Sequence, residues 1–138
     1  MKIELLPHGC RRLVLPTRLD DRGVLTVAEH ADLPVAPART FWISNASRPR
    51  GGHAHRTCRQ ILVAIAGTVR ATFHEGNPLH AWTETLGQPW VGLFMPEMTW
   101  CDIVLSRDAV LVVFASAAYD ESDYIRNESE FVAAVPPG

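Results

Sequence analysis

The chain has 138 residues, of which 47% are hydrophobic and 20% are charged. This length fits one domain with one core, and this composition excludes a disordered or fibrous protein. Thirteen basic against fifteen acidic residues give a formal net charge of -2, which excludes the overall positive field that draws proteins to nucleic acid or anionic lipid. We therefore expect a single domain over residues 1–138, without a nucleic-acid or membrane partner.

Residues 1–16 are interrupted by charged side chains and do not resemble a secretion signal. No run of residues approaches the ~20 apolar positions that are needed to span a bilayer. Three widely spaced cysteines favour neither a disulfide framework nor a Cys-x-x-Cys zinc site; they are Cys10, Cys58 and Cys101. These features predict a cytoplasmic protein with reduced, structural cysteines.

Short β-rich runs separated by Gly, Pro and Asp turn residues recur along the chain, which is the pattern of an all-β sandwich or barrel. Apolar and polar side chains alternate in residues 69–74, so we expect Phe73 to face the core and His74 to point outward. Three further runs are almost wholly apolar, as in strands that are covered on both faces or lie against a partner subunit: residues 61–65, 90–95 and 110–114. We therefore expect a homodimer.

The C-terminal residues 122–135 are the part of the chain predicted to be helical. Tyr124, Glu128, Phe131 and Val135 fall at helical spacing there. We expect Phe131 and Val135 to dock this short helix on the β-structure.

The segment Arg50-Gly51-Gly52-His53-Ala54-His55 carries the most informative residues of the chain. In an extended strand, residues two apart face the same side, so His53 and His55 are expected to project together into one cavity. Imidazoles titrate near neutrality, with a pKa of about 6.5, which suits them to move protons at cellular pH. The alternative is that both are ordinary strand histidines, one exposed and the other hydrogen-bonded in the core.

The spacing of this segment resembles the first cupin motif, in which a His-x-His pair is followed by a carboxylate or amide and then by a glycine, here Gln60 and Gly67. Metal-binding cupins supply a further histidine from a second motif, and Trp100 stands at that position in this chain. An indole cannot bind a divalent metal, and an amide binds one less strongly than a carboxylate does. We therefore expect no metal and no other cofactor, with a metal-dependent oxygenase or isomerase as an alternative.

A family resemblance extends over nearly the whole chain. The five segments that carry it are residues 21–25, 39–43, 50–60, 96–100 and 119–126. They are similar to the sugar 3,4-ketoisomerases that act on dTDP-4-keto-6-deoxyglucose, which are related to the carboxy-terminal part of WxcM-like proteins. The resemblance implies an all-β cupin jelly-roll barrel with a short C-terminal helix, and a dimer. It also implies transfer of the keto group between C4 and C3 of the nucleotide-linked hexose through an enediol, in deoxysugar biosynthesis.

By the same resemblance, His53 is the principal base that takes the C3 proton, and His55 is its partner in relaying or donating protons. Arg50 is expected to counter the negative charge of the enediolate or the diphosphate, with a solvated turn arginine as the alternative. Arg39 either binds the substrate or forms a structural salt bridge. Three further residues complete the expected substrate-binding set: Trp42, Gln60 and Trp100.

The sequence departs from the family pattern at Phe41-Trp42, where family members carry a tyrosine that hydrogen-bonds in the active site. Phe41 has no hydroxyl, and the indole of Trp42 can donate a hydrogen bond but cannot exchange a proton. Four other polar residues near the C-terminus match the family and are interpreted as a packing and capping element: Tyr119, Asp120, Asp123 and Tyr124.

Two other functions stay open at this point. One is a dTDP-sugar 3,5-epimerase, whose layout uses a histidine supported by an aspartate together with a tyrosine, a set that the sequence does not place. The other is a nucleotide-sugar-binding cupin that has lost turnover, which the missing tyrosine favours. Product analysis and solvent deuterium exchange distinguish these from an isomerase.

Overall fold

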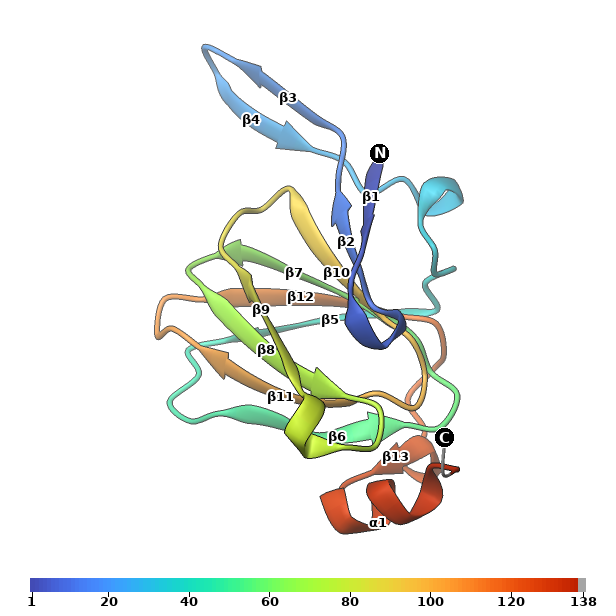
Figure 1. Ribbon diagram of the computed structural model, residues 1–138. Coiled ribbons are helices and arrows are strands. Elements are labelled where there is room, and N and C mark those ends of the chain that lie inside the picture. The colour runs from blue at the N-terminus through green and yellow to red at the C-terminus, as the bar shows by residue number, and fades with distance from the viewer. Residues whose placement is uncertain (137–138) are drawn as a thin grey trace.

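The computed structural model describes residues 1–136, and two antiparallel sheets form most of it (Figure 1). The larger sheet has six strands in the order β1 (Lys2–Leu5), β2 (Arg11–Val14), β10 (Val91–Met95), β7 (Gln60–Ala66), β12 (Val110–Ala115) and β5 (Arg39–Ser44). The smaller has five strands in the order β13 (Tyr124–Ile125), β6 (Arg50–His55), β11 (Trp100–Leu105), β8 (Val69–His74) and β9 (Trp82–Leu86).

The remaining elements are short. A two-stranded hairpin of β3 (Thr17–Asp20) and β4 (Gly23–Thr26) projects beyond the larger sheet (Figure 1). Four 3-10 turns are η1 (Pro7–Gly9), η2 (His30–Asp32), η3 (Pro78–His80) and η4 (Glu121–Asp123), and the α-helix is α1 (Glu128–Ala134). None of the helices among residues 1–136 is long and apolar enough to cross a membrane.

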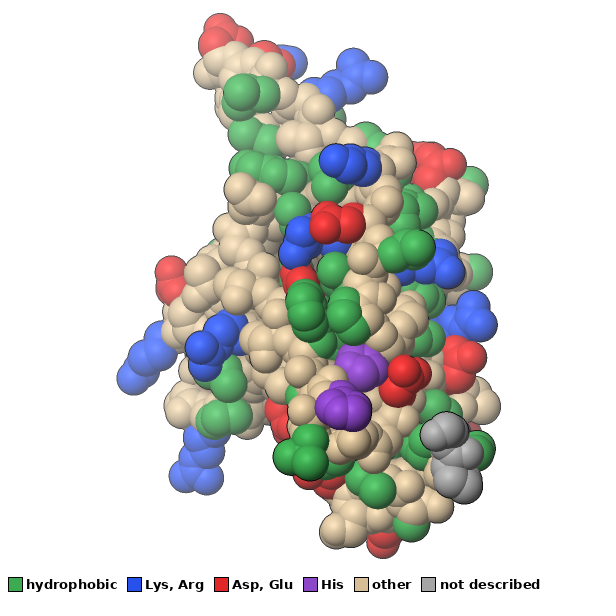
Figure 2. All heavy atoms as spheres, in the orientation of Figure 1, with side chains coloured by type: hydrophobic (Ala, Val, Ile, Leu, Met, Phe, Trp, Pro, Cys, Tyr) green, Lys and Arg blue, Asp and Glu red, His purple; other side chains and the backbone are tan. Residues whose placement is uncertain are grey.

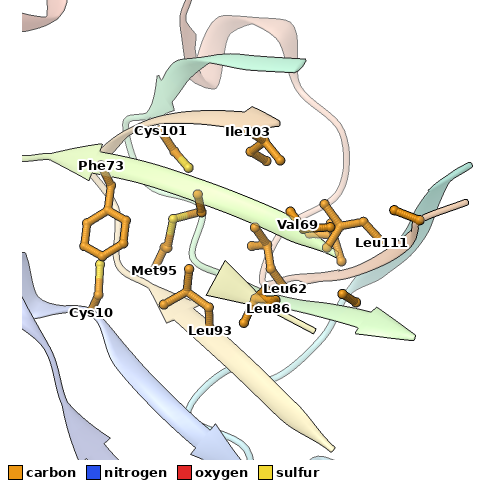
Figure 3. Close-up of a cluster of buried hydrophobic side chains, with 14 residues drawn as sticks. Cys10, Leu62, Val69, Phe73, Leu86, Leu93, Met95, Cys101, Ile103 and Leu111 are labelled. Carbon is orange, nitrogen blue, oxygen red and sulfur yellow. The ribbon is translucent and has the colours of Figure 1, made fainter. Parts of the chain in front are cut away.

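The main core lies between the two sheets and is built from strands of both (Figure 3). Phe73 and Leu111 are fully buried there, on β8 and β12 respectively. The alternation of residues 69–74 thus predicts the core side of β8 correctly. A second apolar cluster covers the other face of the larger sheet and includes Val35, Ile61 and Phe94.

The structure confirms the expected all-β jelly roll with a short C-terminal helix. Its two sheets keep separate hydrogen-bond ladders in the described residues, so the jelly roll has the form of a sandwich. His74 is buried, contrary to the outward orientation expected, because it ends β8 beneath α1 and its Nε2 lies 2.9 Å from Oε2 of Glu128. Glu128, at the start of the helix, supplies the polar contact that the buried imidazole of His74 needs.

The C-terminal helix is shorter than predicted. It covers Glu128–Ala134, with Asn127 as its N-cap, whose side chain accepts a hydrogen bond from the backbone N–H of Glu130. Tyr124 and Ile125, predicted to be helical, form strand β13 and pair with β6 instead. Phe131 is fully buried, as its position on the predicted helix required.

Candidate active site

One cavity opens between the two sheets, and its walls come from strands of both. The larger sheet contributes β5, β7, β10 and β12, and the smaller sheet contributes β6, β11 and β13. Its polar lining residues are Arg50, His53, His55, Gln60, Thr99, Tyr124 and Arg126. The cavity therefore combines imidazoles, a phenol and guanidinium groups against an apolar background.

Strand β6 presents both imidazoles to this cavity, as the two-residue spacing predicts. The ring centroids of His53 and His55 are 5.0 Å apart, and the ring planes are nearly perpendicular, at 88°. Gly51 at the beginning of β6 has a φ of 83°, and a Cβ there would come within 2.7 Å of the backbone oxygen of Cys101. A glycine is required at that position for β6 to lie against β11 and to aim the histidines inward.

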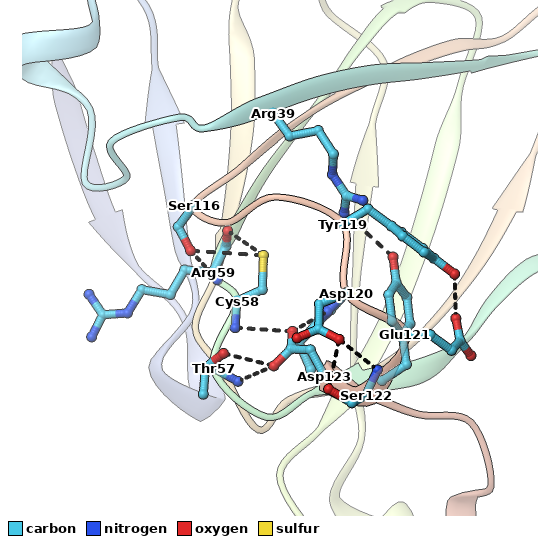
Figure 4. A network of polar contacts seen from close by, with 12 residues as sticks. Arg39, Thr57, Cys58, Arg59, Ser116, Tyr119, Asp120, Glu121, Ser122 and Asp123 are labelled. Carbon is cyan, nitrogen blue, oxygen red and sulfur yellow. Dashed lines mark hydrogen bonds and ion pairs between the residues drawn. The ribbon is translucent and has the colours of Figure 1, made fainter.

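Asp123 forms a hydrogen bond with the imidazole of His55. Oδ2 of Asp123 lies 2.9 Å from Nδ1 of His55. Oδ1 of Asp123 accepts hydrogen bonds from the backbone N–H and the hydroxyl of Thr57 (Figure 4). Because a carboxylate only accepts, Nδ1 of His55 carries the proton and the neutral ring keeps its lone pair on Nε2. Nε2 is buried and has no hydrogen-bond partner among the described residues.

Burial is the main influence on the titration of both imidazoles. It lowers the pKa of His53 to about 4, and a second contribution comes from the positive charge that His55 carries when protonated. Burial also lowers the pKa of His55, while the hydrogen bond and negative charge of Asp123 oppose that shift. Both rings are therefore neutral near pH 7 and able to accept a proton.

Tyr124 packs beside the histidine pair. Its ring centroid lies 5.1 Å from that of His53 and 4.4 Å from that of His55. Nη2 of Arg39 donates a hydrogen bond of 3.5 Å to the phenolic oxygen, and Cζ of Arg126 lies 4.2 Å from the ring centroid. Two cations thus approach this phenol from β5 and from the end of β13.

The substrate-binding residues expected from the sequence divide into two groups. Arg50 and Gln60 line the cavity, and Arg39 reaches its edge through Tyr124. The two tryptophans are not among the lining residues: Trp42 is 68% exposed on the outer face of β5, because Phe41 takes the inward position of that alternating strand. Trp100 is buried against Phe131, and its indole donates to Asp102.

Sequence reasoning missed the roles of the C-terminal segment. Asp123 and Tyr124, interpreted there as packing and capping residues, lie against the histidines, and Arg126 joins them in the cavity wall. The sequence signal was the similarity of residues 119–126 to the family, but no local pattern linked that segment to β6. The structure also assembles the set that the epimerase alternative needed, a histidine supported by an aspartate, with a tyrosine beside them.

One group of donor atoms has the spacing of a metal site, since donor atoms of His55, Cys58 and Asp123 all lie within 4.8 Å of one another. The carboxylate of Asp123 is already committed, because each of its oxygens accepts two hydrogen bonds. A metal would have to displace the bond that orients His55. This donor set fits a hydrogen-bonded dyad better than a resident metal centre.

Comparisons with known proteins converge on one family. The family model described as FdtA: WxcM-like, C-terminal matches residues 8–136. The TDP-4-oxo-6-deoxy-alpha-D-glucose-3,4-oxoisomerase of Aneurinibacillus thermoaerophilus is 36% identical over 117 residues, which cover 82% of this chain and 83% of that protein. Two similar crystal structures are a 3,4-ketoisomerase from Helicobacter canadensis and a mutant of the 3,4-ketoisomerase QdtA from Thermoanaerobacterium thermosaccharolyticum in complex with TDP-4-keto-6-deoxyglucose.

Each of these two crystal structures resembles this chain over almost the full length of both proteins. The Helicobacter canadensis structure has a TM-score of 0.85 and 30% identity, with 90% of this chain and 95% of that one covered. The QdtA structure has a TM-score of 0.87 and 26% identity, with 93% and 94% covered. The jelly-roll fold and the cavity between its sheets can thus be interpreted against enzymes of known activity.

Proposed function

Because the chain belongs to the WxcM-like, C-terminal family, we propose that it is a sugar 3,4-ketoisomerase that acts on a TDP-linked 4-keto-6-deoxyhexose in deoxysugar biosynthesis. The observation that carries this proposal is the imidazole pair of His53 and His55 on the wall of the cavity. Each ring has a buried nitrogen without a hydrogen-bond partner among residues 1–136, Nδ1 of His53 and Nε2 of His55. Neither nitrogen is engaged by a protein hydrogen bond, and a substrate would have to approach each one from the cavity that the two rings line.

The reaction requires a proton to leave C3, next to the C4 ketone, and a proton to return to C4. Removing the first proton gives an enediol or enediolate, and adding the second gives the 3-keto sugar. Two adjacent imidazoles that are neutral near pH 7 suit these steps, since a general base must be unprotonated when the substrate binds.

We assign His53 as the principal base and His55 as its partner. The lowered pKa of His53 means that its ring is ready to accept a proton but does not retain it, so the proton has to move on. His55 can hold a proton because the carboxylate of Asp123 stabilises its imidazolium form. This arrangement supports transfer of the C3 proton to the pair, exchange of that proton with solvent, and return of a solvent-derived proton from the pair to C4.

Cationic side chains near the cavity fit an anionic substrate. Arg50 and Arg126 line it, and a guanidinium group presents several donors in a fixed fork that suits phosphate oxygens. We propose that Arg50 counters the diphosphate or the enediolate and that Gln60 hydrogen-bonds the sugar. Arg39 acts from the edge of the cavity through Tyr124. Trp42 and Trp100 lie outside this wall and have no assigned contact with the sugar.

The test is incubation of the protein with TDP-4-keto-6-deoxyglucose in deuterated water, followed by NMR of the sugar. We expect a 3-keto product that carries deuterium at C4. A sugar that remains a 4-ketone without deuterium at C3 contradicts the proposal and indicates a binding protein.

A second candidate is 3,5-epimerisation of the same class of substrate. The dyad of His55 and Asp123 with Tyr124 beside it is the observation that favours it. Epimerisation leaves the ketone at C4 and inverts C3 and C5. The same NMR experiment therefore separates the two reactions.

We also propose that the protein is a homodimer. The β3–β4 hairpin exposes Leu19, Val24 and Leu25, and Figure 2 shows hydrophobic side chains along this projection. An isolated hairpin is marginally stable in water, so a second copy is expected to cover it. Two apolar grooves that share Leu15 run beside the hairpin and over the outer face of the larger sheet.

Light scattering tests this assembly. We expect a mass near twice 15.3 kDa for the protein, and a lower mass for Leu19→Glu, which places a charge on the exposed hairpin. A mass near 15.3 kDa at micromolar concentration contradicts the proposal. We further propose that the protein works in the cytoplasm, which is consistent with its three free, buried cysteines.

A further inference from the structure

The proposed isomerisation moves two protons, and the histidine pair accounts for one of them. Converting a 3-hydroxy-4-ketone into a 4-hydroxy-3-ketone breaks the C3–H and O3–H bonds and forms the C4–H and O4–H bonds. The imidazoles transfer the proton between the carbons. The proton that passes from O3 to O4 needs a group that can donate to one oxygen and accept from the other.

A phenol meets this requirement because its hydroxyl both donates and accepts, and because its oxygen tolerates negative charge. Tyr124 brings such a hydroxyl to the cavity wall, with its ring 4.4 Å from the ring of His55. Thr99 also lines the cavity, but an alcohol holds negative charge far less well than a phenol does. Tyr124 is therefore the better candidate for transfer between the two oxygens.

Two cationic side chains lie against Tyr124. Nη2 of Arg39 lies 3.5 Å from the phenolic oxygen, and the guanidinium of Arg126 stacks over the ring. Arg39 is itself held in place, since its Cζ lies 5.0 Å from the ring centroid of Phe41 and 5.4 Å from that of Tyr119. The phenolic oxygen is therefore held at the cavity wall by a fixed donor, in a position to exchange a proton with a bound sugar.

We infer that Tyr124 is a further catalytic residue, which donates its proton to O4 as the C3–H bond breaks and, as a phenolate, takes the proton from O3 as C4 is protonated. The tyrosine is regenerated in each turnover, and no oxidant or reductant is needed. This inference rests on the proposed 3,4-isomerisation. Tyr124 on β13 would thus supply a phenolic hydroxyl, whereas Phe41 on β5, where family members carry a tyrosine, has none.

The test compares Tyr124→Phe with Tyr119→Phe in deuterated water. Tyr119 stacks on Tyr124 and carries the same hydroxyl, but it is 60% exposed and does not line the cavity. We expect Tyr124→Phe to lower kcat for product formation by about 10²-fold or more with little change in KM. Deuterium exchange at C3 should fall less, so the ratio of exchange to product rises. Tyr119→Phe should keep the wild-type ratio.

Phe41→Tyr in the Tyr124→Phe background extends the test, since it offers a hydroxyl from the opposite sheet. Partial recovery of product formation supports the role of the hydroxyl. If Tyr124→Phe does not fold, a fluorinated tyrosine at position 124 keeps the shape and makes the phenol more acidic. The alkaline limit of product formation should then move to lower pH.

Three results overturn the inference: wild-type turnover in Tyr124→Phe, an equal loss in Tyr119→Phe, or an alkaline limit that does not move with the fluorinated residue. Failure of the wild-type protein to form a 3-keto sugar refutes the proposed function itself. Wild-type conversion with an inert Tyr124 refutes this inference alone.

Discussion

The Nδ1 atom of His55 and the Oδ2 atom of Asp123 lie 2.9 Å apart although the two residues are separated by 68 positions in the chain. This contact fixes the tautomer of His55 and stabilises its protonated form. We expect Asp123→Asn to reduce kcat by about 10²-fold or more, because an amide nitrogen facing Nδ1 favours the wrong tautomer. Steady-state kinetics of the purified variant measure this loss.

The matched control is Asp120→Asn in the same turn. The carboxylate of Asp120 accepts hydrogen bonds from the N–H and hydroxyl of Ser122 and makes no contact with either active-site histidine among the described residues. This variant should keep most of the wild-type kcat. Comparable losses in both variants would show that the turn matters only for folding.

The division of labour between the histidines can be measured directly. His53→Asn should nearly abolish both product formation and deuterium exchange at C3, because it removes the base. His55→Asn should slow turnover but leave some C3 exchange, since the first proton transfer can still occur. Exchange that survives in His53→Asn and disappears in His55→Asn would invert the two roles, and exchange that survives in both would exclude the histidine mechanism.

The partly buried His53 should make the protein less stable as the pH falls. The pKa of His53 is about 4 in the folded protein against 6.5 for an ordinary histidine, so the unfolded chain binds more protons between these values. We expect the free energy of unfolding to decrease from about pH 6.5 towards pH 4, with an upper limit of roughly 3 kcal/mol from this group.

Urea titrations across this pH range check the slope. His53→Asn should flatten it, whereas His30→Asn, in the exposed turn η2, controls for the loss of a histidine as such. An unchanged slope in His53→Asn would mean that this ring does not cause the acid sensitivity.

We expect activity to survive chelation. The indole of Trp100, which packs against Phe131, occupies the position of the second-motif histidine and cannot bind a metal. Both carboxylate oxygens of Asp123 already accept hydrogen bonds. Elemental analysis and assays after dialysis against a chelator test this expectation, together with Cys58→Ser, which removes one of the clustered donors. Stoichiometric metal, with activity lost on chelation and restored by metal, would refute it.

Local patterns identify the half of the site that lies within one strand. His53 and His55 share a face of β6 because side chains alternate along a strand, and this rule needs no tertiary information. Gly51 is informative for a similar reason, since its backbone conformation excludes a side chain. The predicted all-β class rests on the same local signals.

The other half depends on contacts between distant segments. Helical spacing predicts that Tyr124 lies within a helix over residues 122–135, but pairing with His55 makes it part of β13. Trp42 was wrongly expected to bind the substrate. Side chains alternate along β5, so that Phe41 points inward and Trp42 outward, and the packing of the strand decides which of the two faces the cavity. Tertiary packing overrides local propensity at such positions.

The late position of β13 in the chain has a consequence for folding. Contacts between residues far apart in sequence carry a loop-closure cost and tend to form after more local ones. The antiparallel pairing of β7 with β10 and of β8 with β11 can build the sandwich before Tyr124 and Asp123 reach β6. During refolding, the native β-sheet signal should therefore recover ahead of catalytic competence, with the docking of this one short strand as the step that separates them.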